Sequence, residues 1–317
     1  MAARSVSPKS VRNHRHEALI WPPLKIGQRG AAGEAPENTL ASFDLALKEG
    51  AEGVFIEVQL SSDGVPIVIS GGTLSRTTSG RGRVREKQAN TLLQLDAGSW
   101  FNHRFPSRAR QHYASAPIPL LFEVLYWVRE QKCMALVAIK NPQPEAEVKV
   151  LKEIDRAKVH DLTRVIAYNL PGLRRLRQLD RKVHIGLSIA GRLPAIREAK
   201  ALGAEVLLPH WKAASPSFIY RAHRASMLVI PWTVDSPRQM RRTILEGVDG
   251  IITNYPAKLT ETVARLSKAA RAATAKRIAS YGSGRAALSN SLHGLGLVRN
   301  PGPTPPPLRP STIKEML

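Results

Sequence analysis

The sequence IGQRG at residues 26–30, followed by PENTLASF at residues 36–43, decides how this chain begins to fold. The apolar run Leu24–Gln28 is typical of a short β-strand. The segment Asn38–Lys48 then carries apolar residues at helical spacing, with Asn38 as the expected N-cap and Gly50 as the expected stop. The opening stretch therefore predicts a strand that leads directly into a helix.

Strand-like and helix-like segments alternate along most of the 317 residues. The other strand-like runs are Val54–Gln59, Val65–Ser70, Met134–Lys140, Arg164–Tyr168, Val183–Ser188, Glu205–Leu208, Leu228–Val234 and Gly250–Thr253. The other helix-like segments are Pro119–Glu130, Glu145–Ala157, Leu193–Ala201, Pro216–Ala225 and Pro237–Leu245. Such alternation favours parallel strands joined by right-handed helical crossovers.

Nine candidate strands exceed the eight positions of a (β/α)₈ barrel, and a hairpin accounts for the excess. Ser62-Asp63-Gly64 joins the second and third runs and is a hairpin signal, so we expect these runs to be partly antiparallel, with only their inner ends in the barrel. The span Leu24–Leu259, about 230 residues, is close to the usual ~250 of such a barrel. The predicted fold class is α/β, a (β/α)₈ TIM barrel.

The remaining segments differ in composition from the barrel. Residues 79–116 are Arg-rich and interrupt the alternation, so we expect a cap or insertion at the C-terminal face of the strands. We expect residues 1–23 to form a disordered basic extension and residues 260–280 to form a basic helix. Residues 281–317 are rich in Gly, Ser and Pro, which predicts a disordered tail with polyproline II character.

The formal net charge of +22 is concentrated in two places. From Thr260 to Leu317 there are nine Lys or Arg against two Glu, and from Arg76 to Arg110 there are eight against two acidic residues. Such patches attract polyanions through salt-sensitive forces. We therefore keep open a weak contact of the basic tail with nucleic acid or anionic lipid, beside the simpler interpretation that the charge provides solubility.

Composition also bears on the compartment. The single cysteine, Cys133, excludes an intrachain disulfide within this sequence and fits a reducing environment. No apolar run approaches the ~20 residues that a membrane helix needs. We expect a soluble cytoplasmic protein, although the basic start Met1–His16 is also compatible with an organelle transit peptide.

A series of short motifs gives the chain a family resemblance. After the opening stretch come GAE at 50–52, VQL at 58–60, DGVP at 63–66, TLSRTT at 73–78, IPLLFEVL at 118–125, WTVD at 232–235 and GVDGIITNYP at 247–256. In this order and spacing they resemble the glycerophosphodiester phosphodiesterase family over most of Leu24–Leu259. The resemblance implies a TIM barrel and a phosphoric diester hydrolase of lipid and glycerol metabolism, acting on glycerophosphodiesters.

The resemblance also implies a catalytic apparatus. The family uses two histidines for acid–base transfer and a divalent metal, Ca²⁺ or Mg²⁺, held by a Glu-x-Asp on one strand and a Glu-x-Lys on another. Residues i and i+2 of a strand point to the same face, so this spacing directs both carboxylates to one site.

This chain departs from that apparatus at several positions. Gln28 and Ser70 occupy the two histidine positions, and Gly71 follows Ser70 in place of an aspartate. Phe55 and Ala138 replace two of the three metal carboxylates, so Glu57 alone keeps a carboxylate. A lone carboxylate is a poor cage for a hard cation, and neither Gln nor an unassisted Ser exchanges protons readily near neutral pH. We therefore expect the family mechanism to be impaired and no metal to bind.

Other family positions are retained. Arg29 and Lys140 match the family's phosphate and glycerol contacts, and Glu37 and Trp232 match residues near the site. Cations without their carboxylates can bind a phosphate directly. The competing interpretation is that Arg29 and Lys140 persist in a decayed site, with Glu57 paired to one of them.

Three hypotheses follow from the sequence. The first is a pseudoenzyme that binds a phosphodiester or another phosphorylated small molecule. The second is an active phosphodiesterase with a rearranged site that uses Glu57 and His210. The third is a basic interaction protein that binds polyanions through its tail. Four further histidines are scattered without metal-ligand spacing; they are His103, His112, His160 and His223.

Overall fold

The computed structural model describes residues 22–140, 145–190 and 196–269. The chain divides into two units, residues 1–260 and 261–317, and each is considered by itself. In the second unit the described residues 261–269 are helical. The predictions for the tail after residue 269 and for the extension before residue 22 lie outside the described residues.

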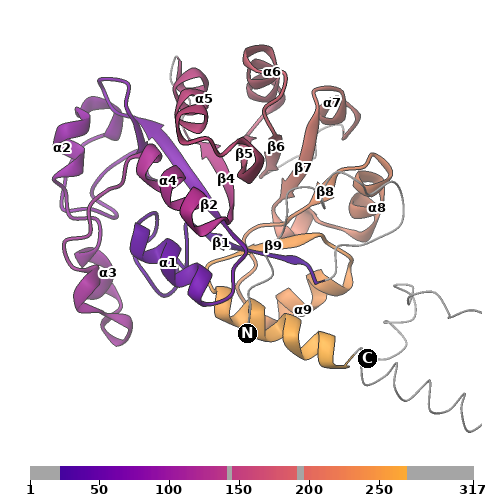
Figure 1. Cartoon of the computed structure of the whole chain (residues 1–317). Coiled ribbons are helices and arrows are strands. Elements are labelled where there is room, and N and C mark those ends of the chain that lie inside the picture. The colour runs from indigo at the N-terminus through magenta and orange to yellow at the C-terminus, as the bar shows by residue number, and fades with distance from the viewer. Residues whose placement is uncertain (1–21, 141–144, 191–195, 270–317) are drawn as a thin grey trace, which may run out of the picture. The chain divides into compact units, whose positions relative to one another are not determined.

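The first unit is built around a parallel sheet that is rolled into a barrel (Figure 1). The strands are β1 (Leu24–Gln28), β2 (Gly53–Leu60), β3 (Pro66–Val68), β4 (Met134–Ile139), β5 (Thr163–Ala167), β6 (Ile185–Ile189), β7 (Ala204–Pro209), β8 (Leu228–Val229) and β9 (Gly250–Thr253). Their order is β8-β7-β6-β5-β4-β2-β1-β9, and every neighbouring pair in it is parallel. The α/β TIM barrel predicted from the alternation is confirmed.

Backbone hydrogen bonds close the ring between β8 and β9. The N–H of Asp249 donates to the Val229 carbonyl and that of Ile252 to the Pro231 carbonyl, both at 3.0 Å. The strand predicted over Leu228–Val234 is wrong in its length, because regular pairing ends at Val229. Pro231 has no N–H to donate, and beyond it the pairing with the chain after β7 persists only as a single bridge between His210 and Trp232.

The second and third predicted strands do form an antiparallel pair, as the turn between them indicated. Val58, Gln59 and Leu60 of β2 face Val68, Ile67 and Pro66 of β3. The expectation that both runs contribute their inner ends to the barrel is wrong for β3. Within the sheet β3 pairs with β2 alone and lies off the ring.

Helices follow the strands and surround the ring (Figure 1). They are α1 (Leu40–Lys48), α2 (Ala89–Leu93), α3 (Ser99–Arg104), α4 (Leu121–Gln131), α5 (Ala146–Ala157), α6 (Leu170–Leu179), α7 (Ile196–Ala201), α8 (Pro216–Arg224) and α9 (Pro237–Leu245). The sequence pattern does not predict helix α6, which Asn169 caps by accepting the Gly172 N–H at 2.8 Å. The predicted cap of α1 is corrected from Asn38 to Thr39, whose side chain accepts the Ser42 N–H.

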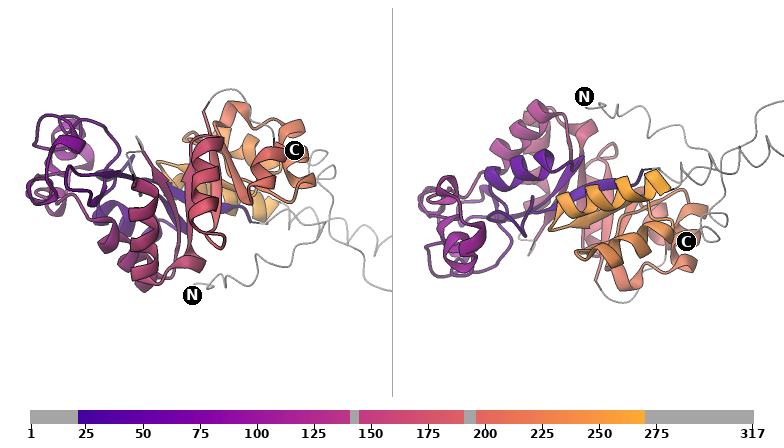
Figure 2. Two further views of the ribbon diagram at one scale, coloured as in Figure 1. Left: turned by 90° about the horizontal axis from the view of Figure 1, so that it is seen from above. Right: turned by 90° about the horizontal axis from the view of Figure 1, so that it is seen from below.

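The Arg-rich segment 79–116 forms α2, α3 and short 3-10 turns beside β3 (Figures 1 and 2). Leu92 of α2 packs with Ile67 of β3 in one apolar cluster. Phe101 of α3 packs with Ala35 in another, and Arg108 donates to the Gly33 carbonyl at 2.7 Å. Because residues 33–35 follow the carboxyl end of β1, the segment packs beside that end of the barrel.

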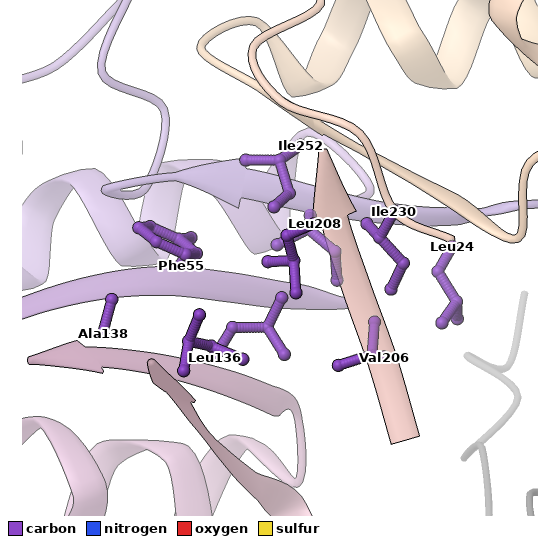
Figure 3. Packing of buried hydrophobic residues seen from close by; sticks show 10 residues of the cluster. Leu24, Phe55, Leu136, Ala138, Val206, Leu208, Ile230 and Ile252 are labelled. Carbon is purple, nitrogen blue, oxygen red and sulfur yellow. The ribbon is translucent and has the colours of Figure 1, made fainter. Parts of the chain in front are cut away.

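The interior of the barrel is apolar. Its buried cluster contains residues of β1, β2, β4, β5, β7 and β9, among them Leu24, Phe55, Leu136, Ala138, Val206, Leu208 and Ile252 (Figure 3). Gly186 allows the strands to approach closely, because a Cβ there would lie 2.4 Å from a Val206 methyl. Burial of this cluster drives the strands to close, at ~25 cal/mol for each Å² of apolar surface removed from water.

Candidate functional site

The carboxyl ends of three adjacent strands bring the predicted site residues together. The strand register sets Gln28 of β1 beside Phe55 of β2, and Glu57 of β2 beside Ala138 of β4. Lys140 follows β4, and its N–H donates to the Val58 carbonyl at 2.8 Å. Active sites of TIM barrels lie at this end of the strands, so these positions form the candidate site.

Arg29 follows β1 in a left-handed conformation, with φ +53°. Its N–H donates to the Phe55 carbonyl at 2.8 Å. Its carbonyl accepts the N–H of Asn38 at 3.0 Å and the hydroxyl of Ser42 at 3.1 Å. A non-glycine residue in this region needs such support, because the conformation costs ~1–2 kcal/mol. The turn therefore fixes where the Arg29 side chain begins.

Glu57 lies at the centre of the site, and its side chain is only 3% exposed. One carboxylate oxygen lies 2.6 Å from Arg29 Nε. The other lies 3.3 Å from Lys140 Nζ and accepts the Tyr168 hydroxyl at 3.1 Å. Ser70 also hydrogen-bonds to this carboxylate. The pairing that the sequence favoured for Glu57 is present, and it involves both cations.

These contacts set the ionisation of the site. Burial alone would raise the pKa of Glu57, but Arg29, Ser70 and Lys140 together hold that pKa below its ordinary value. Burial tends to lower the pKa of Arg29, and the charges of Glu37 and Glu57 outweigh it and raise that pKa. Burial and the neighbouring Glu57 raise the pKa of Tyr168. Glu57 is therefore ionised at neutral pH, and Tyr168 is neutral and donates.

A second carboxylate extends the network outward. Glu37 accepts from Arg29 Nη1 at 3.1 Å and from Arg76 Nη1 at 3.0 Å, while a second nitrogen of Arg76 also donates to it. The Glu37 side chain is 9% exposed and that of Arg76 is 48% exposed. The whole network contains three cations, Arg29, Arg76 and Lys140. Its two carboxylates are Glu37 and Glu57, so its net charge is one positive charge.

Sequence reasoning did not assign a role to Arg76 or Tyr168. Arg76 lies in the motif TLSRTT, which carries part of the family resemblance, and Tyr168 lies at the end of a predicted strand. Functional residues of TIM barrels lie at the carboxyl ends of the strands, so the position of Tyr168 at the end of a predicted strand could have marked it as a site residue. No pattern pointed to Arg76, whose partner Glu37 is 39 residues away.

Apolar groups fill the adjoining positions. Phe55 is 4% exposed and Ala138 is fully buried, and both belong to the interior cluster (Figure 3). Trp232 packs against the same cluster, and its indole N–H donates to the Leu208 carbonyl at 2.8 Å. The His210 ring meets Trp232 edge-on, with centroids 5.6 Å apart. His210 therefore lies near the barrel mouth, next to Trp232.

The residues present do not fit the divalent metal that the resemblance implies. Phe55 and Ala138 offer no oxygen, and both oxygens of Glu57 already contact cationic or hydroxyl groups. Among the described residues no group of three or more His, Cys, Asp or Glu is placed to hold a metal ion. Ca²⁺ and Mg²⁺ require several oxygen ligands. Arg29 and Lys140 instead supply the positive charge beside Glu57.

The residues at the two histidine positions are buried and polar. Gln28 is 6% exposed, and its side-chain carbonyl oxygen has no hydrogen-bond partner among the described residues. Ser70 is 7% exposed and is engaged with Glu57. Neither group titrates near neutral pH. Proton exchange at these positions therefore cannot proceed as it does with an imidazole.

Comparison with known proteins decides the family. The model of the glycerophosphoryl diester phosphodiesterase family matches residues 29–258, which include every candidate-site residue except Gln28, directly before the match. The chain belongs to the glycerophosphoryl diester phosphodiesterase family. The resemblance carried by the sequence motifs is thereby confirmed.

Relatives of this family cover most of the chain. A glycerophosphodiester phosphodiesterase of Caldanaerobacter subterraneus is 32% identical over 76% of this chain and 97% of its own length. The structure of an Oleispira antarctica phosphodiesterase in complex with the product sn-glycerol-3-phosphate is 26% identical. Its TM-score is 0.70, and the match covers 76% of this chain and 96% of that one. A glycerophosphodiester phosphodiesterase structure from Agrobacterium tumefaciens supports the fold. It is 24% identical, with a TM-score of 0.65, and the match covers 75% of this chain and 98% of that one.

Among the described residues, no helix is both long enough and apolar enough to cross a membrane.

Proposed function

We propose that this family member binds a phosphodiester or another phosphorylated small molecule at the barrel mouth without a metal. We further propose that it lacks the family's hydrolytic mechanism. The sequence motivates the second part, because Gln28 and Ser70 stand at the histidine positions.

The Glu57 ion pairs are the observation that carries the proposal. Arg29 and Lys140 contact a buried carboxylate from both sides, where the family resemblance places metal ligands. These cations keep part of their surface in solvent, with side chains 25% and 36% exposed. A phosphate oxygen that approaches from solvent can therefore accept charge-assisted hydrogen bonds from them.

The charge of the network matches an anionic ligand. Three cations and two carboxylates leave one positive charge, so a bound phosphate would not face an excess of negative groups. Arg76 is the most exposed of the cations and lies on the outer side of Glu37. We infer that Arg29 and Lys140 contact the phosphate and that Arg76 stabilises it from the outer side. Trp232 offers an apolar surface for the rest of the ligand.

Calorimetric titration tests the proposal. The probes are sn-glycerol-3-phosphate, glycerophosphocholine and inorganic phosphate, each titrated with EDTA present and again with Mg²⁺ or Ca²⁺. We expect binding of at least one probe that is the same in EDTA and in metal. Lys140→Ala should weaken this binding at least tenfold, since a charge-assisted hydrogen bond contributes ~1.5–3 kcal/mol.

The matched control is Lys152→Ala on α5, which removes an exposed lysine outside the site. It should leave binding unchanged. Absence of binding by every probe, or binding that requires metal, would refute the proposal. Equal losses in Lys140→Ala and Lys152→Ala would show a general charge effect instead of a site.

The comparisons favour a second candidate, an active phosphodiesterase with a rearranged site. The three proteins compared above are all named phosphodiesterases, and the Oleispira antarctica structure is a complex with the product sn-glycerol-3-phosphate. In this alternative Glu57 acts as the base and His210 assists. The lowered pKa of Glu57 makes it a weak base, which counts against this alternative.

Hydrolysis of glycerophosphocholine, measured with Mg²⁺, Ca²⁺ and Mn²⁺ in turn, separates the two candidates. The second predicts turnover that Glu57→Gln abolishes. Absence of turnover with every metal would exclude it. The third hypothesis, polyanion binding through the tail, concerns residues outside those described and predicts salt-sensitive binding that is lost when the tail is removed.

A further inference from the structure

A basic surface lies at the opposite end of the barrel from Glu57. It surrounds the amino-terminal ends of β6, β7 and β8, where the helices α6, α7 and α8 end. We call it the basic rim, and it consists of Leu179, Arg181, Lys182, Lys200, Tyr220 and Arg224. All six side chains are exposed.

Hydrogen bonds hold the ends of these three helices together. Arg177 in the last turn of α6 donates to the Leu202 carbonyl, just after α7, at 3.0 Å. Lys200 of α7 donates to the Ser226 carbonyl, just after α8, at 3.4 Å. The cations of the rim therefore come from neighbouring elements that are tied to one another.

Acidic groups at the rim are few, and two of the three described acidic side chains there have a contact. Neither α6 nor α8 contains an Asp or Glu. Asp180 accepts the Lys182 N–H at 2.7 Å. Glu205 contacts His184 at 2.6 Å and lies 3.6 Å from Arg164. The third, Glu198 of α7, is exposed and is outnumbered by the four cations of the rim. The rim consequently presents an excess of positive charge to solvent.

Exposed apolar side chains accompany these cations. Leu179 is 49% exposed and Tyr220 is 64% exposed, and both are among the most exposed large apolar residues described. Tyr220 lies next to Arg221 and one helical turn before Arg224. Helix dipoles explain basic residues in a last helical turn, but they do not explain these apolar groups.

We propose that the basic rim docks the barrel on an anionic lipid surface. Lipid headgroups attract the Arg and Lys side chains, and the interface accepts the exposed Leu179 and Tyr220. A nucleic acid would satisfy the cations but would gain nothing from an exposed leucine. In the docked orientation the site around Glu57 faces away from the lipid, so this proposal is independent of the proposed function.

The test uses the full chain and co-sedimentation with vesicles. Vesicles of phosphatidylcholine with phosphatidylserine are compared with vesicles of phosphatidylcholine alone, at low and at high salt. We expect binding to the anionic vesicles only, reduced by salt. Replacing Arg181, Lys182, Lys200 and Arg224 together by Ser should weaken it by about a hundredfold or more, since each cation near such a surface contributes about fivefold.

The matched control removes four exposed arginines outside the rim, by Arg81→Ser, Arg83→Ser, Arg85→Ser and Arg241→Ser. It should bind as the wild type does. In the wild-type background, Tyr220→Ser should weaken vesicle binding several-fold. Circular dichroism checks that the rim variant with all four substitutions folds. If it does not, Lys182→Ser and Arg224→Ser are each measured alone, and each should weaken vesicle binding about fivefold.

Three outcomes would overturn the proposal. One is equal binding to anionic and neutral vesicles. Another is an equal loss in the rim variant and the control, which would indicate an effect of net charge. The third is a rim variant that loses binding to an RNA oligonucleotide while its vesicle binding stays unchanged.

Discussion

Replacing Glu57 by Gln should both destabilise the barrel and strengthen anion binding. The Glu57 oxygens lie 2.6 Å from Arg29 Nε and 3.3 Å from Lys140 Nζ. At an effective dielectric constant near 20, these distances correspond to gross attractions of about 6 and about 5 kcal/mol. Desolvation of the buried carboxylate offsets much of this, and solvent screens Lys140, whose side chain is 36% exposed.

Removing one partner of a buried ion pair costs about 3–5 kcal/mol. The partial exposure of both cations places the expectation at the lower end, at about 3 kcal/mol. For a domain of this size that loss lowers Tm by roughly 6–12 °C. Thermal unfolding followed by circular dichroism at neutral pH measures it. Glu86→Gln is the control, because its side chain is 56% exposed and its contact to Arg83 spans 3.9 Å.

The effect should depend on pH in a defined direction. The folded-state pKa of Glu57 is held below its ordinary value, so the carboxylate stabilises the fold fully above the unfolded-state pKa. This contribution is lost as pH falls through the folded-state pKa. The difference in Tm between wild type and Glu57→Gln should therefore be largest near neutrality and shrink in acid.

Two results would refute this reasoning. If Glu57→Gln and Glu86→Gln unfold at the same temperature, the buried ion pairs do not stabilise the barrel. If the Glu57→Gln variant folds but binds inorganic phosphate more weakly than the wild type, Glu57 does not compete with a bound anion for Arg29 and Lys140.

Three further predictions concern the metal position, the free thiol and a helix cap. The triple variant Phe55→Glu, Glu57→Asp, Ala138→Glu should unfold at a lower temperature than wild type without metal, and Ca²⁺ should raise its Tm; an unchanged Tm would show that these three positions cannot hold a metal. Cys133 should resist Ellman's reagent in the folded chain and react after denaturation, because burial raises its pKa to about 12; rapid reaction in the native state would contradict this. Thr39→Ala should cost about 1 kcal/mol in urea unfolding, because the Thr39 side chain caps α1, whereas Thr39→Ser should be nearly neutral.

Much of the fold could be predicted from the sequence because its signals are local. Alternating strand and helix patterns, and the turn Ser62-Asp63-Gly64 between β2 and β3, are readable over a few residues. Helix α6 was not predicted, because its many arginines obscure the short apolar stripe that Leu173 and Leu176 form. The early end of β8 at Val229 was not predicted, because the sequence shows that Pro231 lacks an N–H but only the neighbouring strands decide how far regular pairing extends.

The sequence also predicted the residues of the candidate site better than the contacts between them. Motif spacing indicated which positions matter, including Glu57 as the surviving carboxylate and the retained Arg29 and Lys140. It did not indicate that Tyr168 donates to Glu57 or that Arg76 holds Glu37. Those contacts join residues 111 and 39 positions apart, and no short pattern encodes such a distance.

The sequence by itself determined that this is a barrel of its family with polar or apolar residues where imidazoles and carboxylates are expected. That information is chemical and resides in single positions such as Gln28 and Phe55. Only the tertiary structure decided which groups contact Glu57 and in which protonation state it lies. Strand register places Arg29 and Lys140 on either side of it, and their charges, together with the Ser70 hydrogen bond, outweigh the effect of burial and keep it ionised.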